Sequence, residues 1–130
     1  MSSQTVLIVE DDASSGKLIG NVLASAGVAS ELVTDGVEAL ERLREATPGC
    51  VILDLALPRI DGWEVLSTLH QAGRNVPVIV VTAHGQGDGA NRARALGARR
   101  FFEKPFVPAE LTQAVAEVLA ANNGHHLTRD

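Results

Sequence analysis

The sequence predicts an α/β fold in which a doubly wound parallel sheet lies between two layers of helices. The first observation is that short apolar runs alternate five times with segments of helical periodicity, as repeated βα units do. The second is that three runs, 6–9, 51–53 and 78–81, are apolar throughout, which is typical of strands buried on both faces. With these strands at the centre and right-handed crossovers, the expected strand order is 2-1-3-4-5.

Length and composition predict one globular domain over residues 1–130, with a polar tail at about 122–130. Of the 130 residues, 45% are hydrophobic and 21% charged, and no repeat or linker divides the chain. The net charge of −5 disfavours direct binding of nucleic acid or of an anionic membrane. The single cysteine, Cys50, cannot form an intramolecular disulfide and is expected to be a small buried residue. Without a signal peptide or a membrane-length apolar run, we expect a cytoplasmic protein.

The boundaries of the expected elements follow apolar runs, capping residues and glycines. Asp35 and Asp61, each followed three residues later by Glu, are typical helix N-caps, and Pro108 suits the first turn of the last helix. Gly27, Gly73 and Gly97 are expected to end helices. The strands are expected at 5–9, 29–33, 50–53, 77–81 and 99–102, and the helices at about 13–26, 35–46, 61–71, 91–96 and from 108 onward.

Each helix except the short fourth one carries an apolar stripe that should face the sheet. Gly16 and Gly20 reduce the helix propensity of the first helix, which indicates close packing there. The stripes comprise Leu18, Ile19, Val22, Leu23 and Ala26 in the first helix, Val37, Leu40 and Leu43 in the second, Val65, Leu66 and Leu69 in the third, and Leu111, Ala114, Val115, Val118 and Leu119 in the last.

Acidic side chains follow two of the predicted central strands. Glu10, Asp11 and Asp12 come directly after the first strand, and Asp54 follows the third. Because the carboxyl ends of parallel strands meet at one edge of the sheet, we expect acids from both strands to share a crevice. The alternative for the first group is a solvated helix N-terminus, where acids are favoured by the helix dipole.

Several carboxylates in one crevice require either a proton or a cation. At ~4 Å and an effective dielectric constant near 20, each close pair costs about 4 kcal/mol. An all-oxygen site with room for water suits Mg²⁺. Thr82, at the end of the fourth strand, offers a hydroxyl, although a β-branched strand residue alone would explain it. Lys104 is one of only two lysines beside nine arginines, which favours a specific contact over a general surface charge.

The sequence resembles a two-component response-regulator receiver domain of the CheY-like kind. The stretches that carry the resemblance are 6–12, 54–62, 78–83, 97–98 and 101–106, and together they cover about 5–119. The resemblance implies a flavodoxin-like (βα)5 fold. It also implies a signalling phosphoprotein that is not an enzyme with an external substrate.

The resemblance implies a role for each matched site residue. Asp54 would accept a phosphoryl group from a phosphohistidine of a sensor histidine kinase or phosphotransfer protein. Asp11 and Asp54 would ligate Mg²⁺ (or Mn²⁺) directly, Glu10 through water and Ala56 through its backbone carbonyl. Thr82, the Ala83 N–H and Lys104 would hold the phosphoryl oxygens, and Phe101 would turn inward on phosphorylation. The peptide bond before Pro105 is a candidate for the cis form.

The resemblance also implies an output surface made by the helix at 91–96, the strand at 99–102 and the helix from 108. A downstream protein target is expected there, and a homodimer on phosphorylation is a further hypothesis. Arg99 and Arg100 stand where the family is often acidic, and Val107 replaces a frequent Asp cap. Ala56 and His84 occupy the two positions that tune the lifetime of the aspartyl phosphate in the family.

Other functions fit the residues less well. A haloacid dehalogenase-type phosphatase needs an acid two residues after the nucleophile, where this chain has Ala56, and a flavodoxin-like FMN site needs Ser or Thr where this chain has acids. Residues 85–90 match G-x-G-x-x-A but do not follow the first strand, so a flexible loop is expected. The alternative that stays open is a degenerate receiver that acts as a phosphorylation-independent interaction module.

Overall fold

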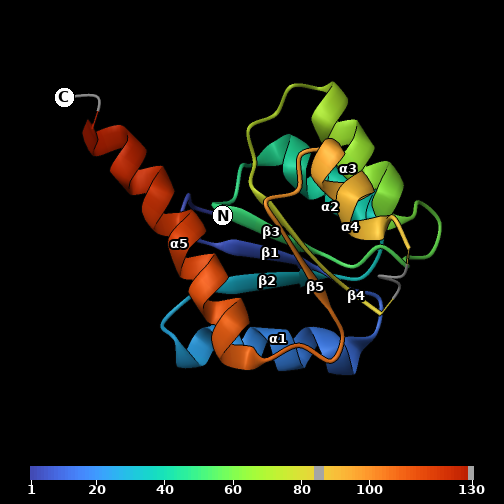
Figure 1. Cartoon of the computed structure of the whole chain (residues 1–130), viewed down its shortest axis with the longest axis horizontal. Helices are drawn as coiled ribbons and strands as arrows, with labels where there is room; N and C mark the ends of the chain where they lie inside the picture. The colour runs from blue at the N-terminus through green and yellow to red at the C-terminus, as the bar shows by residue number, and fades with distance from the viewer. Residues whose placement is uncertain (84–86, 129–130) are drawn as a thin grey trace.

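The protein forms a five-stranded parallel sheet in the order β2-β1-β3-β4-β5, as predicted (Figure 1). The computed structural model describes residues 1–83 and 87–128, and side chains as far as Ala121. The strands are β1 (Val6–Val9), β2 (Ser30–Val33), β3 (Cys50–Leu53), β4 (Val78–Thr82) and β5 (Arg100–Glu103).

The three central strands β1, β3 and β4 are buried along their whole length, whereas β2 and β5 form the partly exposed edges. This confirms the prediction from their apolar runs. The observed strands differ from the predicted ones by at most one residue at an end. Both β4 and β5 begin and end one residue later than expected, so Thr82 is the last residue of β4.

Helices cover both faces of the sheet (Figure 1). Two of them, α1 (Ala13–Ser25) and α5 (Pro108–Thr128), lie on one face. The other three, α2 (Gly36–Glu45), α3 (Gly62–Gln71) and α4 (Gly89–Ala95), lie on the opposite face. Each face has its own apolar core. Successive side chains along a strand point to opposite faces, so they alternate between the two cores. Cys50 is fully buried in the α1/α5 core, as expected.

The helix ends follow the sequence signals. The side chains of Asp12, Asp35 and Asp61 accept hydrogen bonds from backbone N–H groups in the first turns of α1, α2 and α3. Gly27 and Gly73 have φ values of 78° and 67°, in the left-handed region where a glycine commonly ends a helix. The helix α5 begins at Pro108, as predicted.

Two predicted apolar stripes are wrong in part. Leu18 is 55% exposed and Ala26 is also exposed, because the sheet-facing side of α1 is centred on Gly16, Ile19 and Leu23. Gly16 allows the Leu32 side chain to occupy the space that a Cβ would take, which confirms close packing of α1 at that glycine. The predicted α2 positions Val37 and Leu40 are half-buried, while Ala39 takes an innermost place.

Two helices extend beyond their predicted ranges. The helix α4 begins at Gly89, two residues before the expected start, and α5 continues to Thr128 across the stretch predicted as a tail. Figure 1 shows the C-terminal part of α5 projecting beyond the sheet. No helix among the described residues is long and apolar enough to cross a membrane.

Candidate functional site

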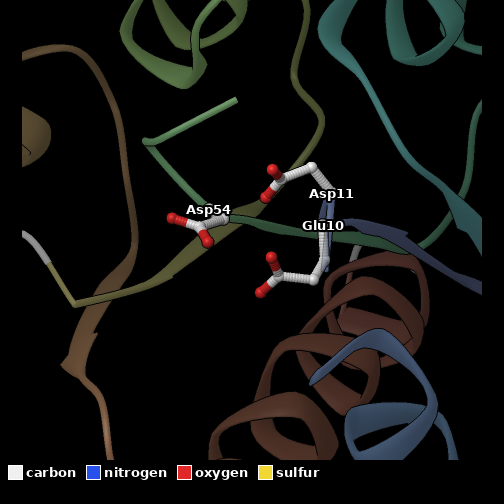
Figure 2. Close-up of side chains that lie close together, drawn as sticks. All are labelled: Glu10, Asp11 and Asp54. Carbon is white, nitrogen blue, oxygen red and sulfur yellow. The ribbon is translucent and has the colours of Figure 1, made fainter. Parts of the chain in front are cut away.

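Three carboxylates from two neighbouring strands meet at the carboxyl edge of the sheet. Glu10 and Asp11 follow β1, and Asp54 follows β3, which pairs directly with β1. Each offers a carboxylate oxygen, and the three oxygens lie within 4.8 Å of one another (Figure 2). Glu10 and Asp54 are only 2% and 6% exposed, whereas Asp11 is exposed. The predicted crevice therefore exists, with two buried acids and one facing solvent.

Asp12 plays a different part from the two acids before it. Its Oδ1 accepts a hydrogen bond from the Ser14 N–H at 3.1 Å, and its Oδ2 accepts one from the Ser15 hydroxyl at 3.1 Å. Asp12 is thus the N-cap of α1. The helix-terminus interpretation is correct for this residue, and the crevice interpretation is correct for Glu10 and Asp11.

Asp54 is surrounded by hydrogen-bond donors from three separate segments. Its Oδ1 accepts from the Thr82 hydroxyl at 2.9 Å and from the Ala56 backbone N–H at 3.1 Å. Its Oδ2 accepts from Lys104 Nζ at 3.1 Å, and the same ammonium also donates to Glu10. Thr82 ends β4 and Lys104 follows β5, so side chains from β4 and β5 donate to the acids that follow β1 and β3.

The electrostatics of the two buried acids differ. Burial raises the pKa of Glu10 to about 7, although the hydrogen bonds from Lys104 and the Asp12 N–H act in the opposite direction. Burial also acts to raise the pKa of Asp54, but the Ala56 N–H, the Lys104 ammonium and the Thr82 hydroxyl outweigh it and lower that pKa. The pKa of Lys104 is raised, because its hydrogen bonds to Glu10 and Asp54 outweigh its partial burial. Asp54 is therefore the more acidic of the two buried groups.

The chemistry of this donor set fits a hard divalent cation. The cluster has three carboxylates and one ammonium, Lys104, so negative charge is in excess. The negative charge of Asp54 adds to burial in raising the pKa of Glu10. All three acids offer oxygen, the ligand type that Mg²⁺ prefers, and exposed Asp11 leaves a side open to water ligands.

The remaining predicted site residues lie around this cluster. Ala83 directly follows Thr82 and is exposed, and Ala56 is also exposed, with its N–H on Asp54. Phe101 is half-buried against the α2–α4 core and pairs with Val80 of β4. The peptide bond between Lys104 and Pro105 is cis. His84, the second tuning position, lies outside the described residues, as do Gly85 and Gln86 of the glycine-rich loop.

Sequence reasoning missed the residues that hold the loop after Asp54. Arg59 has a φ of 64° and forms an ion pair with Asp35, between Nη2 and Oδ2, at 2.8 Å. A Cβ on Gly62 would overlap with the backbone of Asp54 and Leu55, so α3 begins in direct contact with the Asp54 segment. The Asp-Gly pair at 61–62 is recognisable as a helix start, but no periodic signal links Arg59 to a residue 24 positions earlier.

Trp63 is a packing residue between α3 and α4. It is half-buried against the α2–α4 core, and the Arg92 guanidinium lies over its ring, 4.1 Å from the centroid. This contact joins the first turn of α3 to α4 by a cation–π interaction.

Cys50 shows no sign of a reactive thiol, since burial raises its pKa to about 12.

Comparison with known proteins places this geometry in one family. The family model of the response regulator receiver domain matches residues 6–116. The chain is 32% identical to sporulation initiation phosphotransferase F of Bacillus subtilis over 119 residues, which are 92% of this chain and 96% of that protein. It is 35% identical over 120 residues to the DNA-binding response regulator MtrA of Mycobacterium tuberculosis, covering 92% of this chain.

Several curated relatives are longer than this chain, which spans 52% of the length of MtrA. Among solved structures, the receiver domain of NtrX from Brucella abortus superposes with a TM-score of 0.82 at 28% identity, covering 88% of this chain and 98% of that one. Receiver domains pair with histidine kinases, act as phosphoacceptors in two-component signalling and bind Mg²⁺ at an acidic cluster. The chain belongs to the response regulator receiver domain family.

Proposed function

We propose that this domain takes a phosphoryl group onto Asp54 from a phosphohistidine of a sensor histidine kinase or a phosphotransfer protein. The observation that carries the proposal is the environment of Asp54. It is an ionised carboxylate at the edge of the sheet, and Thr82, Lys104 and the Ala56 N–H all donate to it. Two more acids lie within 4.8 Å.

The transfer needs little covalent chemistry from the protein. A carboxylate oxygen of Asp54 bonds to phosphorus as the phosphorus–nitrogen bond to the donor imidazole breaks, and the imidazole nitrogen keeps the electron pair and takes up a proton. Positioning and positive charge on the phosphoryl oxygens supply the catalysis. The Thr82 hydroxyl and the Lys104 ammonium now donate to Asp54, and we propose that they move onto those oxygens together with the Ala83 N–H.

The acidic cluster is the proposed site of Mg²⁺ (or Mn²⁺). Asp11 and Asp54 would ligate the ion directly, Glu10 through water and Ala56 through its carbonyl. When bound, the ion neutralises negative charge on the carboxylates and on the incoming phosphoryl group. Lys104 cannot do this alone, because its single ammonium is already shared by Glu10 and Asp54.

Phosphorylation is proposed to switch the surface formed by α4, β5 and α5. The Thr82–Asp54 hydrogen bond would be replaced by one from Thr82 to the phosphoryl group. Thr82 lies on β4, which pairs with β5, and Phe101 of β5 is the register partner of Val80. Phe101 is only half-buried, so its ring would move from a partly exposed position to an inward one. The local charge change is the trigger, and this surface is the element that it biases.

The part of this surface formed by α4 and the start of β5 favours an acidic downstream target. The rest of the surface carries the exposed acids Glu103 of β5 and Glu110 and Glu117 of α5, and Arg100 Nη1 lies 3.7 Å from Glu117 Oε1. Residues 89–102 contain Arg92, Arg94, Arg99 and Arg100 and no acid, whereas the other 116 residues hold seven basic and 16 acidic side chains, a net −9. All four arginines are exposed. A partner that presents carboxylates would be attracted to residues 89–102 and repelled by the acidic remainder of the domain. Sedimentation with and without beryllofluoride distinguishes such a target from the alternative partner, a second copy of the chain.

The direct test is incubation with acetyl phosphate and Mg²⁺, followed by intact-mass measurement. We expect one added phosphoryl group, none in Asp54→Asn, and none when the metal is chelated. Asp12→Asn is the matched control, because it removes a neighbouring acid yet keeps the oxygen that caps α1. An unmodified wild type would favour a phosphorylation-independent interaction module, and a modified Asp54→Asn would exclude Asp54 as the acceptor.

A further inference from the structure

Arg59 adopts a backbone conformation that a side-chain-bearing residue rarely takes. Its φ of 64° is the only positive value of a non-glycine among the described residues. Such conformations persist where the surrounding structure imposes them, and they cluster at functional sites. Arg59 lies in the loop between β3 and α3, five residues after Asp54, and its guanidinium Nη2 is 2.8 Å from Asp35 Oδ2.

Asp35 is itself held in place by α2. Its second oxygen, Oδ1, accepts the Glu38 backbone N–H at 2.8 Å, and Glu38 in turn accepts the Thr34 N–H at 3.1 Å. These two hydrogen bonds, which resemble a capping box but reach the residue before the N-cap, fix the Asp35 carboxylate. One carboxylate therefore joins the N-terminus of α2 to the β3–α3 loop.

Backbone packing holds the same loop at two further points. A Cβ on Gly36 would overlap with the Ile60 carbonyl, so α2 touches the loop directly beside Arg59. At the other side, the Gly62 N–H donates to the Leu55 carbonyl at 2.9 Å, and Gly62 has no room for a Cβ against Asp54. The segment between Asp54 and Gly62 is therefore fixed where Gly62 packs on Asp54 and Leu55, and again at Arg59 and Ile60, where it contacts the start of α2.

We infer that Asp35 and Arg59 are a positioning pair that orients the β3–α3 loop, and with it the Ala56 carbonyl, toward the cation and the phosphoryl group at Asp54. The inference rests on the proposed function of Asp54. Ala56 lies within this loop, and its N–H already bonds to Asp54 Oδ1 at 3.1 Å, so a shift of the loop changes both the carbonyl and the carboxylate. Neither Asp35 nor Arg59 would touch the ion.

Two substitutions separate positioning from folding. Asp35→Asn keeps an oxygen that can cap α2 and removes the ion pair, whereas Arg59→Gly removes the ion pair and relaxes the positive φ. The measurement is the Mg²⁺ dissociation constant from chemical-shift titration of the full chain. The rate of phosphorylation by acetyl phosphate at subsaturating Mg²⁺ is measured beside it.

We expect each variant to bind Mg²⁺ about tenfold more weakly, as is usual when an outer partner of a metal site is lost, and to be phosphorylated correspondingly more slowly. The double variant should be no worse than either single one, because both remove the same contact. Arg59→Lys, which keeps a cation, should recover part of the affinity. Glu31→Gln, which breaks the Glu31–Arg42 ion pair between β2 and α2, is the matched control and should bind Mg²⁺ normally.

The outcomes distinguish the two proposals. A wild type that binds Mg²⁺ and is phosphorylated, with both variants equal to it, overturns the positioning pair and leaves Asp54 as the acceptor. A wild type that takes neither Mg²⁺ nor a phosphoryl group overturns the proposed function, and the positioning pair falls with it. Weakened binding in Glu31→Gln would show that loss of any surface ion pair has this effect, and would also overturn the inference.

Discussion

Two cations pair with acids on either side of the Asp54 loop, and their surroundings differ. The Lys104 side chain is 21% exposed and bridges Glu10 and Asp54, which are both buried. The Arg59 side chain is 61% exposed and pairs with Asp35, whose side chain is 19% exposed. Loss of the first cation leaves buried carboxylates without compensation, whereas water can replace the second. The buried pair therefore affects stability and chemistry together, and the exposed pair mainly affects geometry.

The backbone contact at Gly62 should matter more to the loop than either ion pair. In Gly62→Ala the new methyl group would overlap with backbone atoms of Asp54 and Leu55, which cannot rotate away. We expect a loss of about 3 kcal/mol in the free energy of unfolding, measured by urea denaturation.

Gly20→Ala is the matched control for that substitution. Its Cβ would lie 3.6 Å from Ser30 Oγ, an ordinary contact, so the higher helix propensity of alanine should stabilise α1 by up to about 1 kcal/mol. If the two variants were equally stable, the close approach of α3 to the Asp54 segment would not exist in solution.

Removal of Lys104, the cation that bridges the two buried acids, is the next largest effect. Without metal, Lys104→Met leaves Glu10 and Asp54 facing each other, and we expect a loss of about 2 kcal/mol, reduced from the usual cost because Lys104 is partly exposed. Urea denaturation with chelator measures it, and Mg²⁺ should restore part of the loss. The chain offers one other lysine, exposed Lys17, and Lys17→Met should leave the midpoint unchanged.

The two ion pairs should change protein stability in opposite directions with pH, because the pKa of Glu10 is raised and that of Asp35 is lowered. Its pKa in the folded protein, about 7, lies above the ordinary value of 4.5, so its contribution to stability is present below pH 4.5 and is lost as the pH rises through 7. Relative to wild type, Glu10→Gln should therefore gain about 2 kcal/mol in chelator across this window.

Urea denaturation across that pH range, with and without Mg²⁺, measures the effect. A cation favours the ionised carboxylate, so Mg²⁺ should reduce the gain. Glu41→Gln, at an exposed position of α2, controls for the loss of one negative charge. A stability difference between Glu10→Gln and wild type that is independent of pH would show that Glu10 is not held in a desolvated place.

The smallest effect is expected at the exposed pair. The Glu38 N–H, followed by Arg59, lowers the pKa of Asp35, so its contribution to stability is present above the ordinary pKa of 3.8 and is lost as the pH falls below it. At neutral pH the urea midpoint of Asp35→Asn should stay close to that of wild type and converge with it as salt increases. A shift as large as that of Lys104→Met would contradict the distinction between the two pairs.

Local patterns along the chain were enough to predict the sheet order, the helix caps and the acids at one edge of the sheet. These features depend on the spacing of apolar residues, on capping chemistry and on the rule that the carboxyl ends of parallel strands lie at one edge of the sheet. The positions of Asp35, Asp61 and Asp54 in the fold therefore follow from local patterns alone. The order and spacing of the family stretches also identified Thr82 and Lys104 as members of the site through the resemblance.

The partner of each of these side chains could be read only from the packed fold. Asp12 caps α1 while Glu10 turns to Lys104, although the two acids are nearly adjacent and chemically alike. Leu18 is exposed because the faces of α1 are set by its contact with β2 at Gly16. The Asp35–Arg59 pair spans 24 residues and two loops, and no local period records such a contact. Local patterns specify elements, whereas side-chain partners depend on how the elements pack.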